Sequence, residues 1–282
     1  MQLPASLPHG GSLKEASNKV KRVITGLLLT VFLIFLVIYA DAFWFFTVVV
    51  LTVGLALLEY YRITVGQEKR LLFIGTLLGV AVPVIIYSFG LKGFGGYLLF
   101  AVFVIFAYCL FSHKEIASVT RHIGIVILGV IYIAFFLSHL ILLRGLEEGS
   151  LWILFLVFII SANDTFAYYA GKRFGKRKLA PIVSPSKTLE GALGGLIGGM
   201  VIATAFQQFF LIKVSSNEVL ILALLIGIIS QFSDLFESLI KRSAGVKDSG
   251  SLLPGHGGVL DRIDSLIFPA PFLYYYIIIF RL

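Results

Sequence analysis

The chain is divided into apolar stretches about as long as a bilayer is thick, and this pattern constrains its fold more than any other feature. A helix that crosses the hydrocarbon core needs about 20 mainly apolar residues, because its backbone polar groups must be satisfied within the segment. Nine such stretches lie approximately at residues 22–40, 42–61, 71–90, 95–112, 122–143, 151–171, 188–212, 218–240 and 263–281. The sequence therefore predicts an all-α, polytopic membrane protein with about nine transmembrane helices.

Composition and the start of the chain fit the same class. Hydrophobic residues make up 59% of the chain and charged residues 13%, which is typical of a protein whose solvent is mostly lipid. The first thirteen residues lack a cationic segment followed directly by an apolar run, so they resemble a tail or a cloning remnant and not a signal peptide. We expect an N-terminal tail over residues 1–21 and a single transmembrane domain over residues 22–282.

Basic residues predict how this domain is oriented. With the N-terminus in the cytoplasm, 19 of the 23 Lys and Arg residues fall on the cytoplasmic side, and Lys92, Arg144, Lys213 and Arg281 fall outside. Cytoplasmic loops of membrane proteins carry an excess of Lys and Arg. We therefore expect a multi-pass integral membrane protein with a cytoplasmic N-terminus and an outer C-terminus, located in the cytoplasmic (inner) membrane if the source is bacterial.

Ionisable residues inside the apolar stretches concentrate in the C-terminal part of the chain. Residues 22–143 hold few of them apart from Glu59, so we expect this part to be a scaffold and residues 151–282 to be the catalytic half. Carboxylates are costly inside a membrane and usually face the bundle interior or a water-filled cavity. Asp164, Asp234 and Glu237 are candidates of this kind within the apolar stretches of the catalytic half.

Helical spacing places these carboxylates on two polar faces. One face holds Ser230, Ser233, Asp234, Glu237 and Lys241, and the other holds Ser161, Asp164, Tyr168 and Lys172. In each set the residues recur at spacings of three or four, which puts them on one side of a helix. We interpret the two faces as walls of one cavity that opens to the cytoplasm. The alternative is a polar seam that joins helices without doing chemistry.

The stretch KDSGSLLPGHGGVLDRID, residues 247–264, is too charged to face lipid. Asp261 and Asp264 are three apart and share a face of any helix that begins near residue 260. Together with Asp248 and Asp234 they would form an oxygen-rich site of the kind that holds a hard cation such as Mg²⁺. His256 fits either a hydrogen bond within the loop or a contact with phosphate or ribose. Adjacent glycines allow a sharp turn and close approach of a ligand.

The connection between the sixth and seventh apolar stretches is strongly basic. It contains Lys172, Arg173, Lys176, Arg177, Lys178 and Lys187, and no carboxylate occurs between Asp164 and Glu190. This pattern favours a polyanionic ligand, although membrane topology and attraction to anionic headgroups also explain it. No P-loop and no dinucleotide-binding GxGxxG pattern occurs, so the common soluble nucleotide sites are excluded.

Two motifs in these regions carry a family resemblance that spans about residues 155–268. The first is formed by Ser238, Lys241, Arg242, Lys247, Asp248, Pro254, His256, Gly257, Gly258, Asp261, Arg262 and Asp264. The second is formed by Asp164, Gly175, Lys176, Lys178, Ser184, Pro185, Lys187, Thr188, Glu190 and Gly191. With these motifs the chain resembles the integral-membrane phosphatidate cytidylyltransferases, also called CDP-diacylglycerol synthases.

The resemblance implies a reaction in which CTP and phosphatidic acid give CDP-diacylglycerol and pyrophosphate, with Mg²⁺ as cofactor and room for a second cation. The cation ligands would come from Asp234, Asp261, Asp264 and Asp248. The catalytic residues would be Asp234, Asp261, Lys241, Arg242, His256 and Arg262. Nucleotide and phosphate contacts would come from Asn163, Asp164, Lys176, Lys178, Ser184, Lys187, Thr188, Lys247, Gly257 and Gly258.

Other functions stay open on the sequence alone. A CTP-dependent enzyme that acts on an isoprenoid or ether lipid would need the same charges, and glycine- or proline-broken helices around charges also occur in transporters of organic anions. Besides the bilayer and the two substrates we expect no nucleic-acid partner. A ladder of glycines from Gly191 to Gly199 is compatible with packing inside the chain or with a homodimer.

Overall fold

The computed structural model describes residues 26, 28, 30–66, 68–112, 116–210, 214–252 and 257–280. Within these ranges eight helical spans are long and apolar enough to cross a membrane, and the shorter apolar helix Thr30–Tyr39 precedes them. Each coincides with a stretch predicted from the sequence, so the all-α, polytopic fold is confirmed. The predicted tail over residues 1–21 lies outside the described residues.

Six of the eight spans are single helices. They are α2 (Ala42–Val65), α3 (Lys69–Phe89), α4 (Leu91–Ser112), α7 (Gly149–Phe174), α8 (Leu189–Phe210) and α9 (Ser216–Ser243). The fourth of the eight spans consists of the 3₁₀ turn η1 (Ile116–Ser118), α5 (Val119–Leu128), the π-helical segment η2 (Gly129–Phe135) and α6 (Phe136–Arg144).

The last span is broken at a proline. Helix α10 (Leu260–Ile267) ends before Phe268, and α11 (Pro269–Phe280) begins with Pro269. Proline lacks the backbone N–H that would continue the ladder, and it is well suited to the first position of a helix. The short α10 is thus a separate unit that holds Asp261 and Asp264, and α11 carries the span onward.

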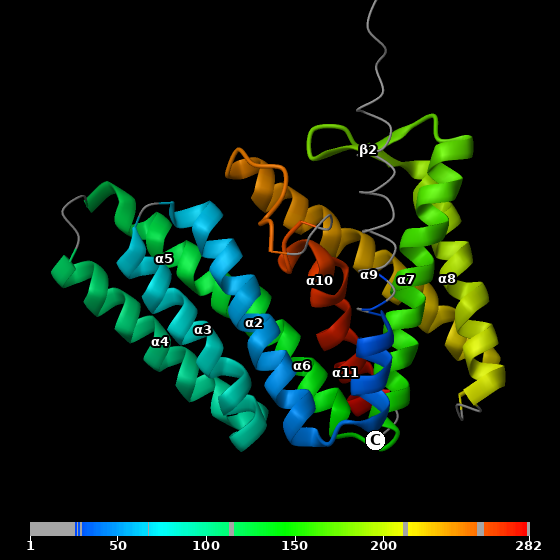
Figure 1. Cartoon of the computed structure of the whole chain (residues 1–282), viewed down its shortest axis with the longest axis horizontal. Coiled ribbons are helices and arrows are strands. Elements are labelled where there is room, and N and C mark those ends of the chain that lie inside the picture. The colour runs from blue at the N-terminus through cyan, green and yellow to red at the C-terminus, as the bar shows by residue number, and fades with distance from the viewer. Residues whose placement is uncertain are drawn as a thin grey trace, which may run out of the picture.

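The helices form two groups, with the last span between them (Figure 1). Helices α2 to α6 pack on one another on one side, while α7, α8 and α9 pack together on the other. Helix α10 contacts α9 and α7 in the second group and α2 and α6 in the first. The aspartates of α10 are therefore placed where both groups meet.

The glycine ladder of α8 packs against α7. A Cβ added at Gly195 would lie 2.7 Å from the carbonyl oxygen of Asn163, and one at Gly191 would lie 2.8 Å from that of Ala167. These distances are too short for any side chain, so α8 needs glycine to approach α7 this closely. Because the ladder is used for packing inside the chain, these glycines give no support to the alternative of a homodimer contact.

The basic connection contains a small β-hairpin that the sequence analysis treated as a loop. Strand β1 (Lys178–Ala180) pairs antiparallel with β2 (Ser184–Thr188), and the hairpin lies beyond the ends of α7 and α8 (Figure 1). The Glu190 carboxylate accepts hydrogen bonds from the backbone N–H groups of Lys176 and Arg177. Strands this short leave no periodic pattern, so apolar alternation could not reveal them.

Candidate active site

A buried lysine joins the two helices that carry most of the predicted site. Lys241, in the last turn of α9, lies 2.6 Å from the Glu237 carboxylate one turn earlier and 2.7 Å from that of Asp261 on α10. Glu237 is fully buried. One cation between two carboxylates offsets much of the cost of burying them, since each charge keeps an opposite partner. The contact fixes α10 against α9.

Asp261 also hydrogen-bonds to both described parts of the charged stretch, residues 247–252 and 257–264. Its carboxylate accepts hydrogen bonds from the backbone N–H groups of Ser249, at 3.1 Å, and Gly258, at 2.8 Å. Gly257 has a φ of 79°, and a Cβ there would lie 2.7 Å from the Asp261 carboxylate. Glycine is thus required at this position for both its backbone conformation and its lack of a side chain.

A second charged cluster lies one helical turn away on α9. Lys187, from β2, forms an ion pair with Asp234. Asp164 on α7 and Asp264 on α10 are within electrostatic range of Asp234. The two polar helix faces predicted from the sequence therefore converge, with α10 added between them.

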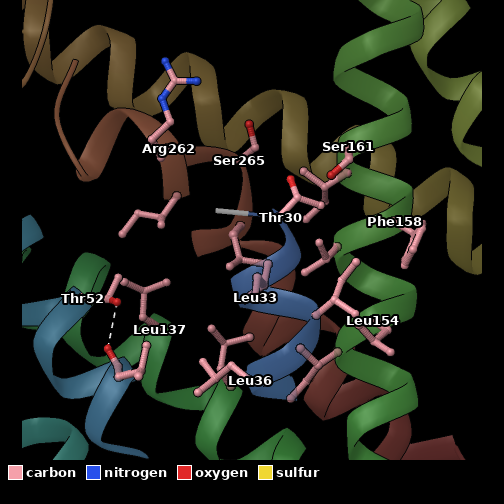
Figure 2. A pocket seen from close by; sticks show the side chains of 18 of the residues that line it. Thr30, Leu33, Leu36, Thr52, Leu137, Leu154, Phe158, Ser161, Arg262 and Ser265 are labelled. Carbon is pink, nitrogen blue, oxygen red and sulfur yellow. Dashed lines mark hydrogen bonds between the residues drawn. The ribbon is translucent and has the colours of Figure 1, made fainter. Parts of the chain in front are cut away.

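A cavity of about 570 Å³ begins at Asp164 and Asp264 of this cluster and extends into an apolar region. Its polar end is formed by Ser161, Asp164, Asp261, Arg262, Asp264 and Ser265. Leu33 and Leu36 of the Thr30–Tyr39 helix line the apolar part, together with Leu137 of α6. Figure 2 shows Arg262 and Ser265 at one end of the cavity and Leu36 at the other. The cavity can accept a molecule with a charged head and an apolar chain.

The walls of this cavity differ from those expected. The sequence predicted a cavity between the polar faces of the sixth and eighth apolar stretches. Helices α7 and α10 do contribute, but the remaining lining residues are Gly26 and residues of the Thr30–Tyr39 helix, α2 and α6, and none come from α8 or α9. The apolar walls were not recognisable in the sequence, because a leucine that faces a cavity and one that faces lipid look alike.

The other predicted site residues occupy several distinct places. The Asn163 side chain is buried, where it donates to the Ser230 hydroxyl and accepts from Gln231. Arg242 donates to the backbone oxygens of Val183 and Val246, which ties the hairpin to the end of α9. Arg242 is exposed, and so are Lys176, Lys178, Lys247 and Asp248.

Three predicted residues remain. The Thr188 hydroxyl accepts a hydrogen bond from the Gly191 N–H group at the start of α8, and Ser184 is half-buried on β2. His256 lies outside the described residues, as does Pro254 of the motif. The contacts of Asn163, Arg242 and Thr188 hold elements together, so each has a structural role in addition to the predicted ligand contact.

Two residues of the first half reach the site without having been assigned a role there. Glu59 of α2 is buried and accepts a hydrogen bond from the Ser249 hydroxyl. The Tyr132 ring, in the π-helical segment, packs edge-on against Phe236 and Phe268. A carboxylate in an apolar stretch was the available signal for Glu59, whereas nothing in the sequence marked Tyr132.

The carboxylates of the second charged cluster are of the chemical type that binds a hard divalent cation. Among the described residues no three His, Cys, Asp or Glu side chains surround one point closely enough to hold a metal on their own. Magnesium in phosphate-handling sites usually takes one or two carboxylates and completes its shell with water and substrate phosphates. Within the part of the chain that the structure describes, Lys187 is the one lysine that forms an ion pair with Asp164, Asp234 or Asp264, so these residues leave oxygen ligands and negative charge for such an ion.

The pairing of Lys241 gives a prediction about stability. Replacing Lys241 by Met leaves Glu237 and Asp261 buried without their cation, and we expect a loss of about 3–5 kcal/mol. A second change, Glu237→Gln, removes one of the two uncompensated charges and should recover part of the loss. Thermal unfolding of the purified variants in detergent measures both effects.

Lys247→Met is the matched control, because Lys247 is an exposed lysine in the same region. Surface substitutions of this kind usually change stability by less than about 0.5 kcal/mol. Unfolding of Lys241→Met at the wild-type temperature would show that the buried ion pairs do not stabilise the junction of α9 and α10.

Comparison with known proteins agrees with this geometry. Residues 20–280 match the cytidylyltransferase family model. The chain is 33% identical to the phosphatidate cytidylyltransferase of Bacillus subtilis (strain 168), over 92% of this chain and 98% of that protein. It is 46% identical to the phosphatidate cytidylyltransferase of Haemophilus influenzae over 46% of each chain. It is also 39% identical to the uncharacterized protein YnbB of Escherichia coli (strain K12), over 79% of this chain and 75% of that protein. The chain therefore belongs to the cytidylyltransferase family.

Proposed function

We propose that this enzyme transfers the cytidylyl group of CTP to phosphatidic acid, giving CDP-diacylglycerol for phospholipid biosynthesis and releasing pyrophosphate. The names of the Bacillus and Haemophilus relatives support both substrates. The observation that carries the proposal is the amphipathic cavity, whose polar end lies beside the charged clusters and whose remaining walls are apolar. A phospholipid with a phosphate headgroup matches that division.

The lipid phosphate suits the polar end of the cavity. Arg262 is exposed there and offers a planar, permanently charged group that can hold two phosphate oxygens at once. Leu33, Leu36 and Leu137 line the part that an acyl chain would fill. Burial of a chain in such a cavity contributes about 0.8 kcal/mol for each methylene removed from water.

The nucleotide phosphates suit the basic hairpin. Lys176 and Lys178 are exposed, and Lys187 extends from β2 to the Asp234 carboxylate. Cations placed in this way can neutralise a triphosphate and stabilise the pyrophosphate as it leaves. The hairpin is joined to α9 through Arg242, so both clusters are held at fixed positions relative to each other.

The reaction requires positioning more than activation of a nucleophile. An oxygen of the lipid phosphate attacks the α-phosphorus of CTP, a new phosphorus–oxygen bond forms, and the bond to the oxygen that bridges the α and β phosphates breaks. The attacking group is already an anion, so no side chain needs to remove a proton from it. Holding the two phosphates together and neutralising their charge is the main task of the site.

We propose that Mg²⁺ binds where the carboxylates exceed their cation partners. Asp234, Asp264 and Asp164 would hold it, with Asp261 of the first cluster and the exposed Asp248 as further candidates. When bound, the ion would supply charge neutralisation for the phosphates of both substrates. A second cation in the same site remains part of the proposal, since several carboxylates are available.

The activity itself is the first prediction. Pyrophosphate release from CTP by the purified protein should require phosphatidic acid. In Leu33→Trp the larger ring fills the apolar part, and we expect the KM for phosphatidic acid to rise about tenfold, equivalent to about 1.4 kcal/mol of lost contact. The KM for CTP should not change. Initial rates in mixed micelles, with each substrate varied in turn, measure both constants.

Phe35→Trp is the control, since Phe35 lies on the same helix but is exposed and does not line the cavity. Release of pyrophosphate with an isoprenoid phosphate or an ether-linked lipid, and none with phosphatidic acid, would assign the chain to another acceptor. An equal effect of the two tryptophans would show that the cavity does not bind the lipid.

Loss of the cation should abolish activity. A chelator should stop the reaction and added Mg²⁺ should restore it. Asp234→Asn keeps the shape of the side chain but removes the charge that holds a hard cation, so we expect turnover to fall at least about a hundredfold while the protein stays folded. CTP turnover and thermal stability should be measured together. Normal turnover in Asp234→Asn would exclude Asp234 as a ligand.

Asp41→Asn is the control for that change. Asp41 caps α2 by accepting a hydrogen bond from the Trp44 N–H group, and Asn is also a good N-cap. We expect unchanged turnover in this variant.

We further propose that the active site faces the cytoplasm. The hairpin and the connection from α9 to α10 lie at the same end of the bundle, opposite the C-terminus (Figure 1). They carry Lys176, Lys178, Lys187 and Lys247, as the excess of basic residues in cytoplasmic loops would require. A cysteine introduced at Ser251 should react with an impermeant reagent only from the cytoplasmic side. A reporter fused after residue 282 should lie outside, and the reverse pattern would overturn the orientation.

A further inference from the structure

Glu59 is a buried carboxylate on α2 that belongs to neither charged cluster. Only 5% of its surface is exposed. It accepts hydrogen bonds from the N–H group of Val259 at 3.0 Å, the N–H group of Leu260 at 2.9 Å and the Ser249 hydroxyl at 3.1 Å. All three donors belong to the charged stretch before and at the start of α10. Glu59 lies in the first half of the chain, and it thus holds a segment that is distant in sequence: Ser249 is 190 residues away from it.

The contacts are those of a helix cap supplied from outside the helix. The first N–H groups of any helix have no partner within it, and a carboxylate placed against them satisfies them and interacts favourably with the helix dipole. Val259 and Leu260 are the cap and the first residue of α10, and no side chain of their own forms this cap. Glu59 takes that place.

The backbone around Glu59 is shaped to admit it. A Cβ added at Gly250 would lie 2.6 Å from a carboxylate oxygen of Glu59, and its three nearest atoms would all belong to that side chain. A Cβ added at Gly258 would clash with the Ser249 hydroxyl and with a carboxylate oxygen of Glu59. Two glycines are therefore needed for the carboxylate to reach the backbone.

We propose that Glu59 is a positioning residue for the transfer reaction: it holds both described ends of the charged stretch so that Asp261 and Arg262 keep their places at the polar end of the cavity. Asp261 accepts from Ser249 N–H and Gly258 N–H, the same backbone that Glu59 holds through its other donors. Loss of Glu59 frees the first turn of α10 and shifts Asp261 with it. This inference rests on the proposed function of the site.

Glu59→Gln tests the inference with little change in size. One oxygen becomes an amide donor that faces a backbone N–H or the Ser249 hydroxyl, so at least one of the three hydrogen bonds is lost. We expect kcat to fall about 10- to 100-fold, because a displacement of about 1 Å at a reacting group has an effect of this size. The KM for CTP should stay within about threefold of the wild-type value. Each rate should be expressed per amount of folded protein, which is collected from the monodisperse peak in detergent.

Hydrogen exchange gives a readout that does not need the reaction. The Val259 and Leu260 amides should exchange at least about tenfold faster in Glu59→Gln than in the wild type, because exchange follows local opening. If the wild type has no cytidylyl transfer activity, the proposed function fails, while exchange still decides whether Glu59 orders this segment. Unchanged exchange at both amides would overturn the inference.

Gly250→Ala provides a second variant that leaves Glu59 intact. Its methyl group meets the Glu59 side chain, and Gly250 is not among the glycines with positive φ, so alanine fits the backbone. Alone it should lower kcat as Glu59→Gln does. Combined with Glu59→Ala, which removes the obstructed carboxylate, it should add less than about a twofold loss. Independent, multiplicative effects in this double-mutant cycle would contradict the coupling.

Tyr61→Phe is the matched control on the same helix. Tyr61 is fully buried, and its hydroxyl donates to the Val126 carbonyl oxygen of α5, away from the charged stretch. This variant loses one buried hydrogen bond and should lower thermal stability, but kcat and exchange at Val259 and Leu260 should stay within about twofold of the wild type. An equal fall of kcat in Tyr61→Phe and Glu59→Gln would show that Glu59 acts only through global stability.

Discussion

The placement of Lys241 between Glu237 and Asp261 is the interaction on which the site depends. A carboxylate inside a membrane bundle is costly unless a partner charge is close, and here one ammonium group serves two carboxylates from different helices. The pairing fixes α10 on α9 and sets where Asp261 stands. Once Asp261 is fixed, its other hydrogen bonds close the charged stretch onto the start of α10.

The first half of the chain contributes more than a framework. The Thr30–Tyr39 helix, α2 and α6 supply much of the apolar wall of the cavity, and α2 supplies the Glu59 cap. An enzyme that joins a water-soluble nucleotide to a lipid needs a charged end and an apolar space side by side. In this fold the C-terminal helices supply most of the charged groups, and helices from both halves enclose the space.

The sequence predicted the elements whose signal is local. Apolar length predicted the membrane spans, and spacing placed Asp234, Glu237 and Lys241 on one face of α9, as found. It could not predict which partner Lys241 would take on α10, because that depends on how two helices separated by a long connection approach each other. The hairpin was too short to leave a pattern, and the cavity walls resemble ordinary lipid-facing residues.

The glycines of the charged stretch have a structural role that differs from the one interpreted from the sequence. On sequence alone Gly257 and Gly258 were interpreted as room for a ligand to approach the backbone. The structure places the Asp261 carboxylate against Gly257 and the Glu59 carboxylate against Gly258. These glycines therefore have a packing role that is independent of any ligand: they let two carboxylates, one from each half of the chain, reach the backbone N–H groups at the start of α10. Since α10 carries Asp261, Arg262 and Asp264, the small size of these glycines sets the geometry of the polar end of the cavity.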